Sequence, residues 1–204
     1  MTSPSAAQAA AAGPSMPPAV VEVLTEWLGA ARCLLEFGAG GSTLLAARLG
    51  VRDVVSIESD RAFLDDVAGQ VAAIGGRTRL HPVHVDIGPT GAWGRPRDES
   101  RFAAWHRYPQ AGYDELRSRR LKADVILVDG RFRVACLLAG LLAAAPGTRL
   151  LFDDYTTRSK YHVVERFVKP DAVVDRAALF TLPAKVDVRA AAFALARYSV
   201  QPAS

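Results

Sequence analysis

Short apolar runs alternate along the chain with segments in which apolar residues recur every three or four positions. The runs predict buried strands, and the second pattern predicts helices that pack on one face. Regular alternation of strand and helix is typical of a parallel sheet covered by helices on both sides. We therefore expect a doubly wound α/β fold. Strands are predicted at 32–37, 54–57, 80–85, 125–128 and 149–152, and helices at 19–28, 42–49, 60–75, 134–145 and 161–168.

Residues 87–119 interrupt this pattern. They are rich in Pro and Gly and hold much of the aromatic content of the chain. A loop of this length in a compact domain is usually a lid, a binding element or a disordered segment. Because the aromatic side chains argue against disorder, we expect a substrate-facing insertion with a short helix near 99–106.

The two ends of the chain differ in character. Residues 1–18 are rich in Ala, Ser and Pro and predict a flexible tail. Two β-type segments follow the last predicted helix, near 172–180 and 191–198. We expect one domain over 19–204, with the insertion inside it.

The stretch Leu-Leu-Glu-Phe-Gly-Ala-Gly-Gly-Ser-Thr, residues 34–43, places three glycines between a strand and a helix. Glycine permits positive φ angles and lets a ligand approach the main chain. The first turn of the following helix offers unpaired N–H groups and a partial positive charge. The stretch therefore predicts a loop for a nucleotide-type cofactor at the carboxyl edge of the sheet.

Acidic side chains stand at or beside the ends of five successive predicted strands. The carboxyl ends of parallel strands meet at one edge, where ligands of such sheets bind. The alignment of separate acids on that edge is the strongest functional signal in the sequence. The acids are Glu36, Glu58, Asp86, Asp129, Asp153 and Asp154.

The spacing of Glu36, Gly38 and Gly40 resembles motif I, acid-x-Gly-x-Gly, of the class I S-adenosylmethionine-dependent methyltransferases. A dinucleotide fingerprint would have its third glycine where Thr43 stands, so an NAD-linked oxidoreductase is the weaker alternative. The resemblance implies a Rossmann-like sheet of about seven strands, mostly parallel with an antiparallel last strand. It also assigns the two late β-type segments to an antiparallel hairpin at one edge.

The same resemblance implies that S-adenosylmethionine is the cofactor. Glu58 lies 18 positions after Gly40, where an acid accepts hydrogen bonds from the ribose hydroxyls. Asp60 is better placed as the N-cap of the next helix. Glu36 would help to hold the cationic amino acid end, and Asp129 would lie near the transferring methyl group. The other implied contacts are Gly38, Ala39, Gly40, Gly41 and Ser42 for the methionine part and ribose, and Asp86 and Ile87 for adenine.

Some O-methyltransferases with this layout bind a divalent cation between an acid after the fourth strand and an acidic pair after the fifth. That comparison assigns Mg²⁺ to Asp129, Asp153 and Asp154, which carry the oxygen ligands that Mg²⁺ prefers. The sequence reads Val-Asp-Gly-Arg where those enzymes have Asp-Ala-Asp. In the alternative hypothesis, Arg131 pairs with one of these acids instead.

Several residues near this edge are candidates for contact with the acceptor substrate. Arg131 and Arg133 could hold a carboxylate or phosphate, or pair with the acids. His106 and His162 are the candidate general bases in a site without metal. Trp93 in the insertion and Tyr155 after the fifth strand are further substrate-binding candidates.

Composition narrows the choice of partner. The chain has 204 residues and a formal net charge of +4, with arginines concentrated between 95 and 133. This excess of positive charge suits binding of an anionic substrate or nucleic acid. Alternatively, the arginines form a solvated surface without a ligand. Nucleic acid is the less favoured acceptor, because no separate RNA-binding domain and no Asn-Pro-Pro-Tyr-type motif is present.

No membrane span or signal peptide is predicted, and Cys33 and Cys136 read as buried reduced thiols, so we expect a cytoplasmic protein. The predicted function is methyl transfer from S-adenosylmethionine to an O or N nucleophile of a small or medium-sized substrate. The alternative is a non-catalytic binding or regulatory module. A homodimer is one option for the oligomeric state.

Overall fold

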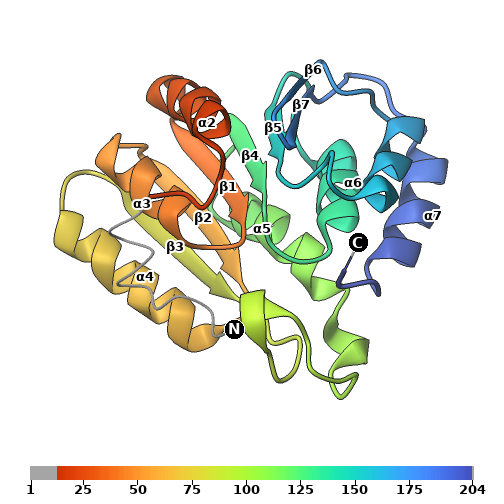
Figure 1. Cartoon of the computed structure of the whole chain (residues 1–204), viewed down its shortest axis with the longest axis horizontal. Coiled ribbons are helices and arrows are strands. Elements are labelled where there is room, and N and C mark those ends of the chain that lie inside the picture. Colours follow the sequence, from red (N-terminus) through yellow and green to blue (C-terminus); the bar gives the residue numbers. More distant parts are fainter. Residues whose placement is uncertain (1–12, 204) are drawn as a thin grey trace.

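The structure is a computed structural model that describes residues 13–203, and a seven-stranded sheet forms its centre (Figure 1). The strand order is β3-β2-β1-β4-β5-β7-β6, and the first five run parallel. β7 runs antiparallel to β5, and β6 pairs antiparallel with β7. The strands are β1 (Cys33–Phe37), β2 (Asp53–Glu58), β3 (Arg79–His84), β4 (Val125–Val128), β5 (Arg149–Phe152), β6 (Ala172–Val174) and β7 (Ala177–Thr181).

Helices cover both faces of this sheet, which confirms the doubly wound α/β prediction (Figure 1). One face carries α2 and α3, with α4 beside them, and the other carries α5, α6, η3 and α7. The helices are α2 (Pro18–Ala30), α3 (Gly41–Arg48), α4 (Arg61–Ile74), α5 (Arg107–Ser118), α6 (Arg133–Ala143) and α7 (Val188–Tyr198), with short 3₁₀ segments η1 (Ala92–Gly94), η2 (Phe102–Ala104) and η3 (Ser159–Arg166).

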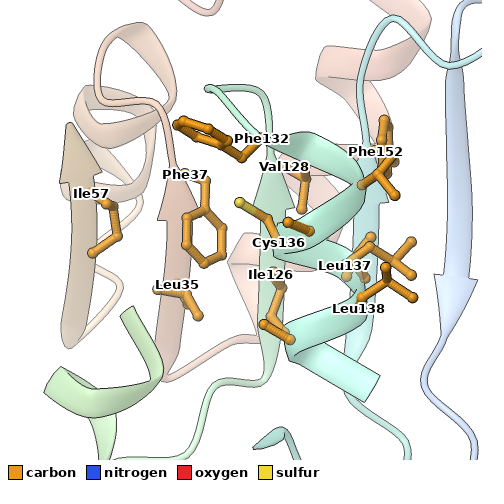
Figure 2. Close-up of a cluster of buried hydrophobic side chains, with 14 of the residues drawn as sticks. Leu35, Phe37, Ile57, Ile126, Val128, Phe132, Cys136, Leu137, Leu138 and Phe152 are labelled. Atoms are coloured by element: carbon orange, nitrogen blue, oxygen red, sulfur yellow. The ribbon is translucent and has the colours of Figure 1, made fainter. Parts of the chain in front are cut away.

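Successive side chains of a buried strand point to opposite faces of the sheet, and each face has its own hydrophobic core. Leu35 and Phe37 of β1 lie in the larger core with α6, as Figure 2 shows beside Ile126 and Val128 of β4. Leu34, one position away, lies in the smaller core with α2. Both β1 and β4 are buried along their whole length, which explains why all their residues except Glu36 are apolar.

Three predicted elements differ from the structure. The segment 191–198 is not a strand but part of α7, and the hairpin is β6–β7. The residues of this segment that contact the core are spaced three and four positions apart, as on one face of a helix, and not two apart as in a strand: Ala191, Leu195 and Tyr198. The helix predicted at 161–168 is the 3₁₀ segment η3, which begins at Ser159.

The third difference lies in the insertion. Residues 87–119 contain α5, a 12-residue helix that the sequence did not suggest, whereas the short helix expected near 99–106 is present as the 3₁₀ segment η2. Tyr108, Tyr113 and Leu116 form one buried face of α5, although Pro109 stands in its first turn, where proline is tolerated. The aromatic residues of the insertion are therefore largely core residues.

The predicted tail of residues 1–18 falls mostly outside the described residues. Its described end is attached to the domain, because Met16 packs against the smaller core and the Ser15 carbonyl accepts a hydrogen bond from Arg176. Within residues 13–203, no helix is both long and apolar enough to cross a membrane. Cys33 and Cys136 are both buried and unpaired.

Candidate functional site

The glycine loop joins β1 to α3 and touches the loop after β4. Gly38 has φ +99°, and a Cβ placed there would lie 2.9 Å from the backbone of Gly130. Glycine at 38 therefore allows both the left-handed backbone and the close contact between the two loops. A Cβ on Gly41 would lie 2.1 Å from the Gly13 carbonyl oxygen, so the segment before α2 crosses the start of α3.

Glu36 supports this loop from inside the protein. It is fully buried and accepts hydrogen bonds from the hydroxyls of Ser42 (2.7 Å), Ser56 (2.8 Å) and Thr43. No cation neutralises it among these contacts, and burial raises the pKa of the Glu36 carboxyl to about 7. Its contact with the amino acid end of a cofactor stays a prediction, since its oxygens are engaged by these hydroxyls.

Glu58 ends β2 beside the glycine loop. Its Oε1 accepts hydrogen bonds from the Ser59 amide (2.6 Å), the Asp60 amide (3.0 Å) and the Ser59 hydroxyl (3.0 Å). The carboxylate is almost buried, and burial raises its pKa. All three of these bonds fall on Oε1, and the Ala39 amide also donates to the carboxylate. Because a carboxylate has about four lone-pair sites, Glu58 can still accept ribose hydroxyls.

The η1 turn of the insertion lies over Glu58. The Ser59 hydroxyl donates to the Gly94 carbonyl at 3.3 Å, and a Cβ on Gly94 would come within 3.4 Å of Glu58 Oε1. Trp93 in this turn has φ +61° and is 62% exposed. The insertion therefore covers the acid at the end of β2, as a lid over this site would.

The end of β3 presents a different environment. The Asp86 side chain is about half exposed, accepts from the Gly88 amide and pairs with Arg101 at 3.1 Å. Ile87 is buried, and its carbonyl accepts the Trp105 indole N–H at 2.8 Å. The adenine contacts predicted for Asp86 and Ile87 stay predictions.

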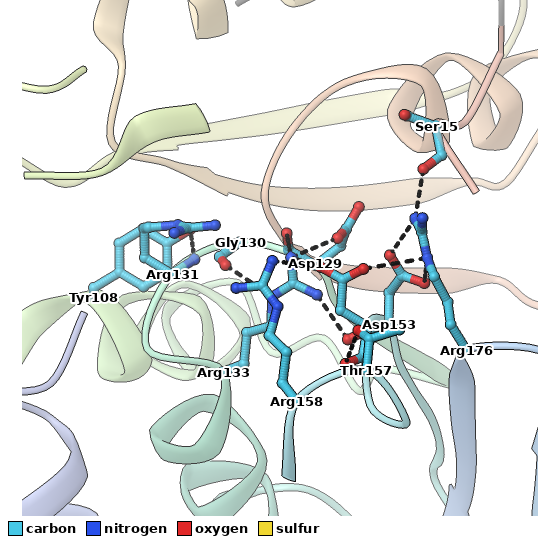
Figure 3. A network of polar contacts seen from close by, with 11 residues as sticks. Ser15, Tyr108, Asp129, Gly130, Arg131, Arg133, Asp153, Thr157, Arg158 and Arg176 are labelled. Atoms are coloured by element: carbon cyan, nitrogen blue, oxygen red, sulfur yellow. Dashed lines mark hydrogen bonds and ion pairs between the residues drawn. The ribbon is translucent and has the colours of Figure 1, made fainter. Parts of the chain in front are cut away.

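Beyond the glycine loop, three carboxylates meet three arginines at the ends of β4 and β5 (Figure 3). Arg133 is buried at the centre, and its Nη2 pairs with Asp129 at 2.9 Å and Asp154 at 3.3 Å. Arg176 holds both oxygens of Asp153, at 2.9 and 2.8 Å. Arg158 adds a pair with Asp154 at 3.1 Å. We call this set the arginine–aspartate cluster: Asp129, Asp153, Asp154, Arg133, Arg158 and Arg176.

The cluster does not fit the predicted Mg²⁺ site. Each of its carboxylates already pairs with at least one guanidinium, and a divalent cation would have to displace or approach these arginines. Within the part of the chain that the structure describes, no group of three or more His, Cys, Asp or Glu side chains is arranged to hold a metal ion. We therefore derive no chemistry through Mg²⁺.

Arg131 and Arg133 have different environments, although the sequence suggested the same alternatives for both. Arg133 bonds to carboxylates and to the carbonyls of Gly130, Asp129 and Asp153. Arg131 is 7% exposed, and its Nε has no hydrogen-bond partner among residues 13–203. The pairing of Arg131 with the acids, the alternative drawn from the sequence, is therefore wrong, and Arg133 takes that place.

The remaining candidates lie around this edge without meeting at one point. His106 is exposed at the start of α5. His162 is exposed, stacks on Tyr155 and contacts the Tyr155 carbonyl at 3.2 Å. The Tyr155 hydroxyl donates to Glu165 at 2.8 Å, which with burial raises the pKa of Tyr155. Their catalytic or substrate-binding roles stay predictions.

Three cations at this edge were not predicted from the sequence: Arg158, Lys160 and Arg176. Arg176 lies 23 positions after Asp153 in the β6–β7 turn, so no local motif links the two. Arg158 and Lys160 follow β5 closely, and a count of cations after that strand would have drawn attention to them.

Similarity to a solved structure supports the fold described above. No protein-family model and no curated protein sequence matches this chain. Among solved structures, it is similar to a methyltransferase-like protein from Silicibacter pomeroyi DSS-3, with 37% identity, a TM-score of 0.84, and coverage of 93% of this chain and 97% of that one.

Two further structures are more distant. An RNA methyltransferase from Salinibacter ruber in complex with S-adenosyl-L-homocysteine has 18% identity and a TM-score of 0.48, covering 84% of this chain and 95% of that one. The C-terminal domain of precorrin-6Y C5,15-methyltransferase from Rhodobacter capsulatus has 14% identity and a TM-score of 0.47, covering 82% and 89%. The similarity to the Silicibacter protein extends over nearly the whole of both chains.

Proposed function

Because this chain belongs to the class I S-adenosylmethionine-dependent methyltransferases, we propose that it transfers a methyl group to an O or N nucleophile of a small or medium-sized substrate. The observation that carries the proposal is Glu58. Its carboxylate lies beside a glycine loop at the carboxyl edge of the sheet, nearly buried, with one oxygen still able to accept hydrogen bonds.

The residues of the first three strand ends suit S-adenosylmethionine. In the glycine loop, Gly40 has the open position, since a Cβ there would meet nothing closer than Phe63 at 3.9 Å, whereas Gly38 packs against Gly130 and Gly41 against Gly13. Glu58 would receive the ribose hydroxyls, and Gly38 to Ser42 would contact the methionine part. The exposed Asp86 would contact adenine, next to the buried Ile87. When bound, the cofactor supplies a methyl group on a cationic sulfur.

Asp129 is our candidate general base. It follows β4 directly, next to the Gly130 backbone that touches Gly38. Burial and the nearby Asp153 and Asp154 carboxylates raise the pKa of Asp129 to about 7, against the opposing effect of Arg133. A base is most effective when its pKa lies near the working pH. Asp129 would take the proton that the nucleophile loses as the methyl group is transferred.

The insertion supplies the cover over the reacting groups. With Gly94 bonded to Ser59 above Glu58, the η1 turn limits the access of water to the ribose side of the site. Catalysis would then consist mainly of aligning the nucleophile with the methyl group in a site shielded from water.

Calorimetric titration with S-adenosylmethionine and with S-adenosylhomocysteine, each with and without Mg²⁺, tests the proposal. We expect saturable binding of both with about equal affinity in the presence and absence of Mg²⁺. Absence of binding to both in a folded sample would overturn the proposed function. Binding without methyl transfer to any of a broad panel of O and N nucleophiles would favour the non-catalytic module.

A further inference from the structure

The arginine–aspartate cluster leaves one buried cation without a partner. Arg131 is 7% exposed, its Nε forms no hydrogen bond, and no residue in the described range 13–203 forms an ion pair with it. In Figure 3 its side chain lies against Tyr108, on the side away from the carboxylates toward which Arg133 and Arg158 turn. A buried guanidinium without an anion is costly, so its presence calls for a ligand.

Arg131 stands next to the predicted point of methyl transfer. The preceding residue, Gly130, is the one whose backbone touches the glycine loop at Gly38, and a Cβ on Gly130 would lie 2.8 Å from the Gly38 nitrogen. The Arg131 amide also lies 3.4 Å from the Tyr108 hydroxyl. A group bound to Arg131 would therefore lie beside the cofactor loop.

Two further cations without ion-pair partners in the described residues share this region. Lys160 lies 5.6 Å from the centre of the Tyr161 ring, which Arg158 and Arg133 also approach, at 5.8 and 6.0 Å. Arg95 follows the η1 turn that covers Glu58. Burial and the surrounding arginines, Arg95 and Arg131 among them, lower the pKa of Lys160, so these cations repel one another.

We propose that Arg131, with Lys160 and Arg95 beside it, binds an oxyanion group, a phosphate or a carboxylate, on the acceptor substrate. This inference rests on the proposed function and adds the chemical class of its substrate. The guanidinium offers a planar pair of N–H donors that fits either oxyanion. The carboxylates of the cluster do not compete with this oxyanion for Arg131, because they are already paired with Arg133, Arg158 and Arg176.

Titration of the protein with inorganic phosphate and with malonate, at constant ionic strength in chloride, measures this site without any methyl transfer. We expect saturable binding of at least one of the two, and the tighter one identifies the group as phosphate or carboxylate. Arg131→Met should weaken it by about 10- to 100-fold, as expected for a lost charge-assisted bond. Arg131→Lys should retain part of the affinity, because it keeps the charge but loses the fork.

Matched variants separate binding from structure. Lys160→Met and Arg95→Met should lower the affinity for the anion by smaller factors. Arg97, two positions from Arg95, is also exposed, and Arg97→Met should leave the anion affinity unchanged. Arg131→Met should not destabilise the protein, because it removes an unpaired buried charge. Loss of stability with unchanged anion affinity would show a structural role and overturn the inference.

The two proposals fail in different ways. Binding of S-adenosylhomocysteine without saturable binding of phosphate or malonate would overturn the oxyanion site and leave the methyltransferase proposal standing. Conversely, the wild-type protein could bind the anion saturably, lose that binding in Arg131→Met, and bind neither S-adenosylmethionine nor S-adenosylhomocysteine. That result would overturn the methyltransferase proposal and leave the oxyanion site standing. Unchanged affinity of Arg131→Met for S-adenosylhomocysteine is the expected control.

Discussion

The two halves of the ligand edge of the sheet both bury carboxylates but hold them with different partners. At the ends of β1 and β2, Glu36 and Glu58 accept hydrogen bonds from hydroxyl and amide N–H groups, and from no cation in the described part of the chain. At the ends of β4 and β5, Asp153 and its neighbours are held by guanidinium groups, with Arg133 at the centre. The first half therefore keeps acids without counter-charge, and the second half keeps ion pairs.

The difference indicates a division of labour. Neutral donors leave the carboxylate of Glu58 able to accept hydroxyl groups of a ligand, which is what ribose recognition requires. Ion pairs neutralise the aspartates and leave Arg131 on that side without an ion pair among the residues that the structure describes. We infer that the first half binds the cofactor and the second half receives an anionic acceptor.

Removing the central arginine should have the largest effect. Arg133→Met leaves Asp129 and Asp154 without their buried partner, and breaking a buried pair from one side costs about 3–5 kcal/mol. Urea denaturation measures this loss in the free energy of unfolding. The matched control is Arg61→Met, which breaks the exposed i,i+4 pair with Asp65 and should cost less than about 1 kcal/mol. Equal losses in the two variants would remove the contrast between the halves.

In the half at the ends of β1 and β2, where the carboxylates have no counter-charge, stability should instead depend on pH. The Glu36 carboxyl has a pKa of about 7 in the folded protein against an ordinary 4.5, because it is buried. Between these values the folded state holds a proton that the unfolded state releases, so stability falls as pH rises from the lower value to the higher. Relative to Glu36→Gln, the wild-type free energy of unfolding should fall by about 3 kcal/mol across this window and stay level above it.

Urea denaturation from pH 4.5 to pH 8 measures that difference. Glu22→Gln, on the exposed side of α2, is the control and should run parallel to the wild type at every pH. A pH-independent difference between wild type and Glu36→Gln would mean that Glu36 is ionised throughout, and that the hydroxyls alone stabilise its charge.

Much of the fold could be predicted from the sequence, because the buried β4 leaves an uninterrupted apolar run and β1 a run broken only by Glu36. The amphipathic α5 was missed because Pro109 and Gly112 hid its period, although one is in the first turn and the other packs against Leu35. The acids of the site could be located, since strand ends are local features. Their partners could not, because Arg176 reaches Asp153 only through the antiparallel pairing of β7 with β5.

Truncation of Glu58 should affect cofactor binding while leaving the second half intact. Glu58→Ala removes the proposed acceptor for the ribose hydroxyls, and loss of a hydrogen bond to a charged group costs about 1.5–3 kcal/mol, or about 10- to 100-fold in affinity. Calorimetric titration with S-adenosylhomocysteine measures this change. Asp60→Ala is the neighbouring control. The Asp60 side chain caps α4 by accepting a hydrogen bond from the Phe63 amide, so its removal should lower the stability of the protein but not its affinity for S-adenosylhomocysteine. Unchanged affinity in Glu58→Ala would remove the ribose role. A simultaneous loss of phosphate or malonate binding would show that the two halves of the edge act as one site.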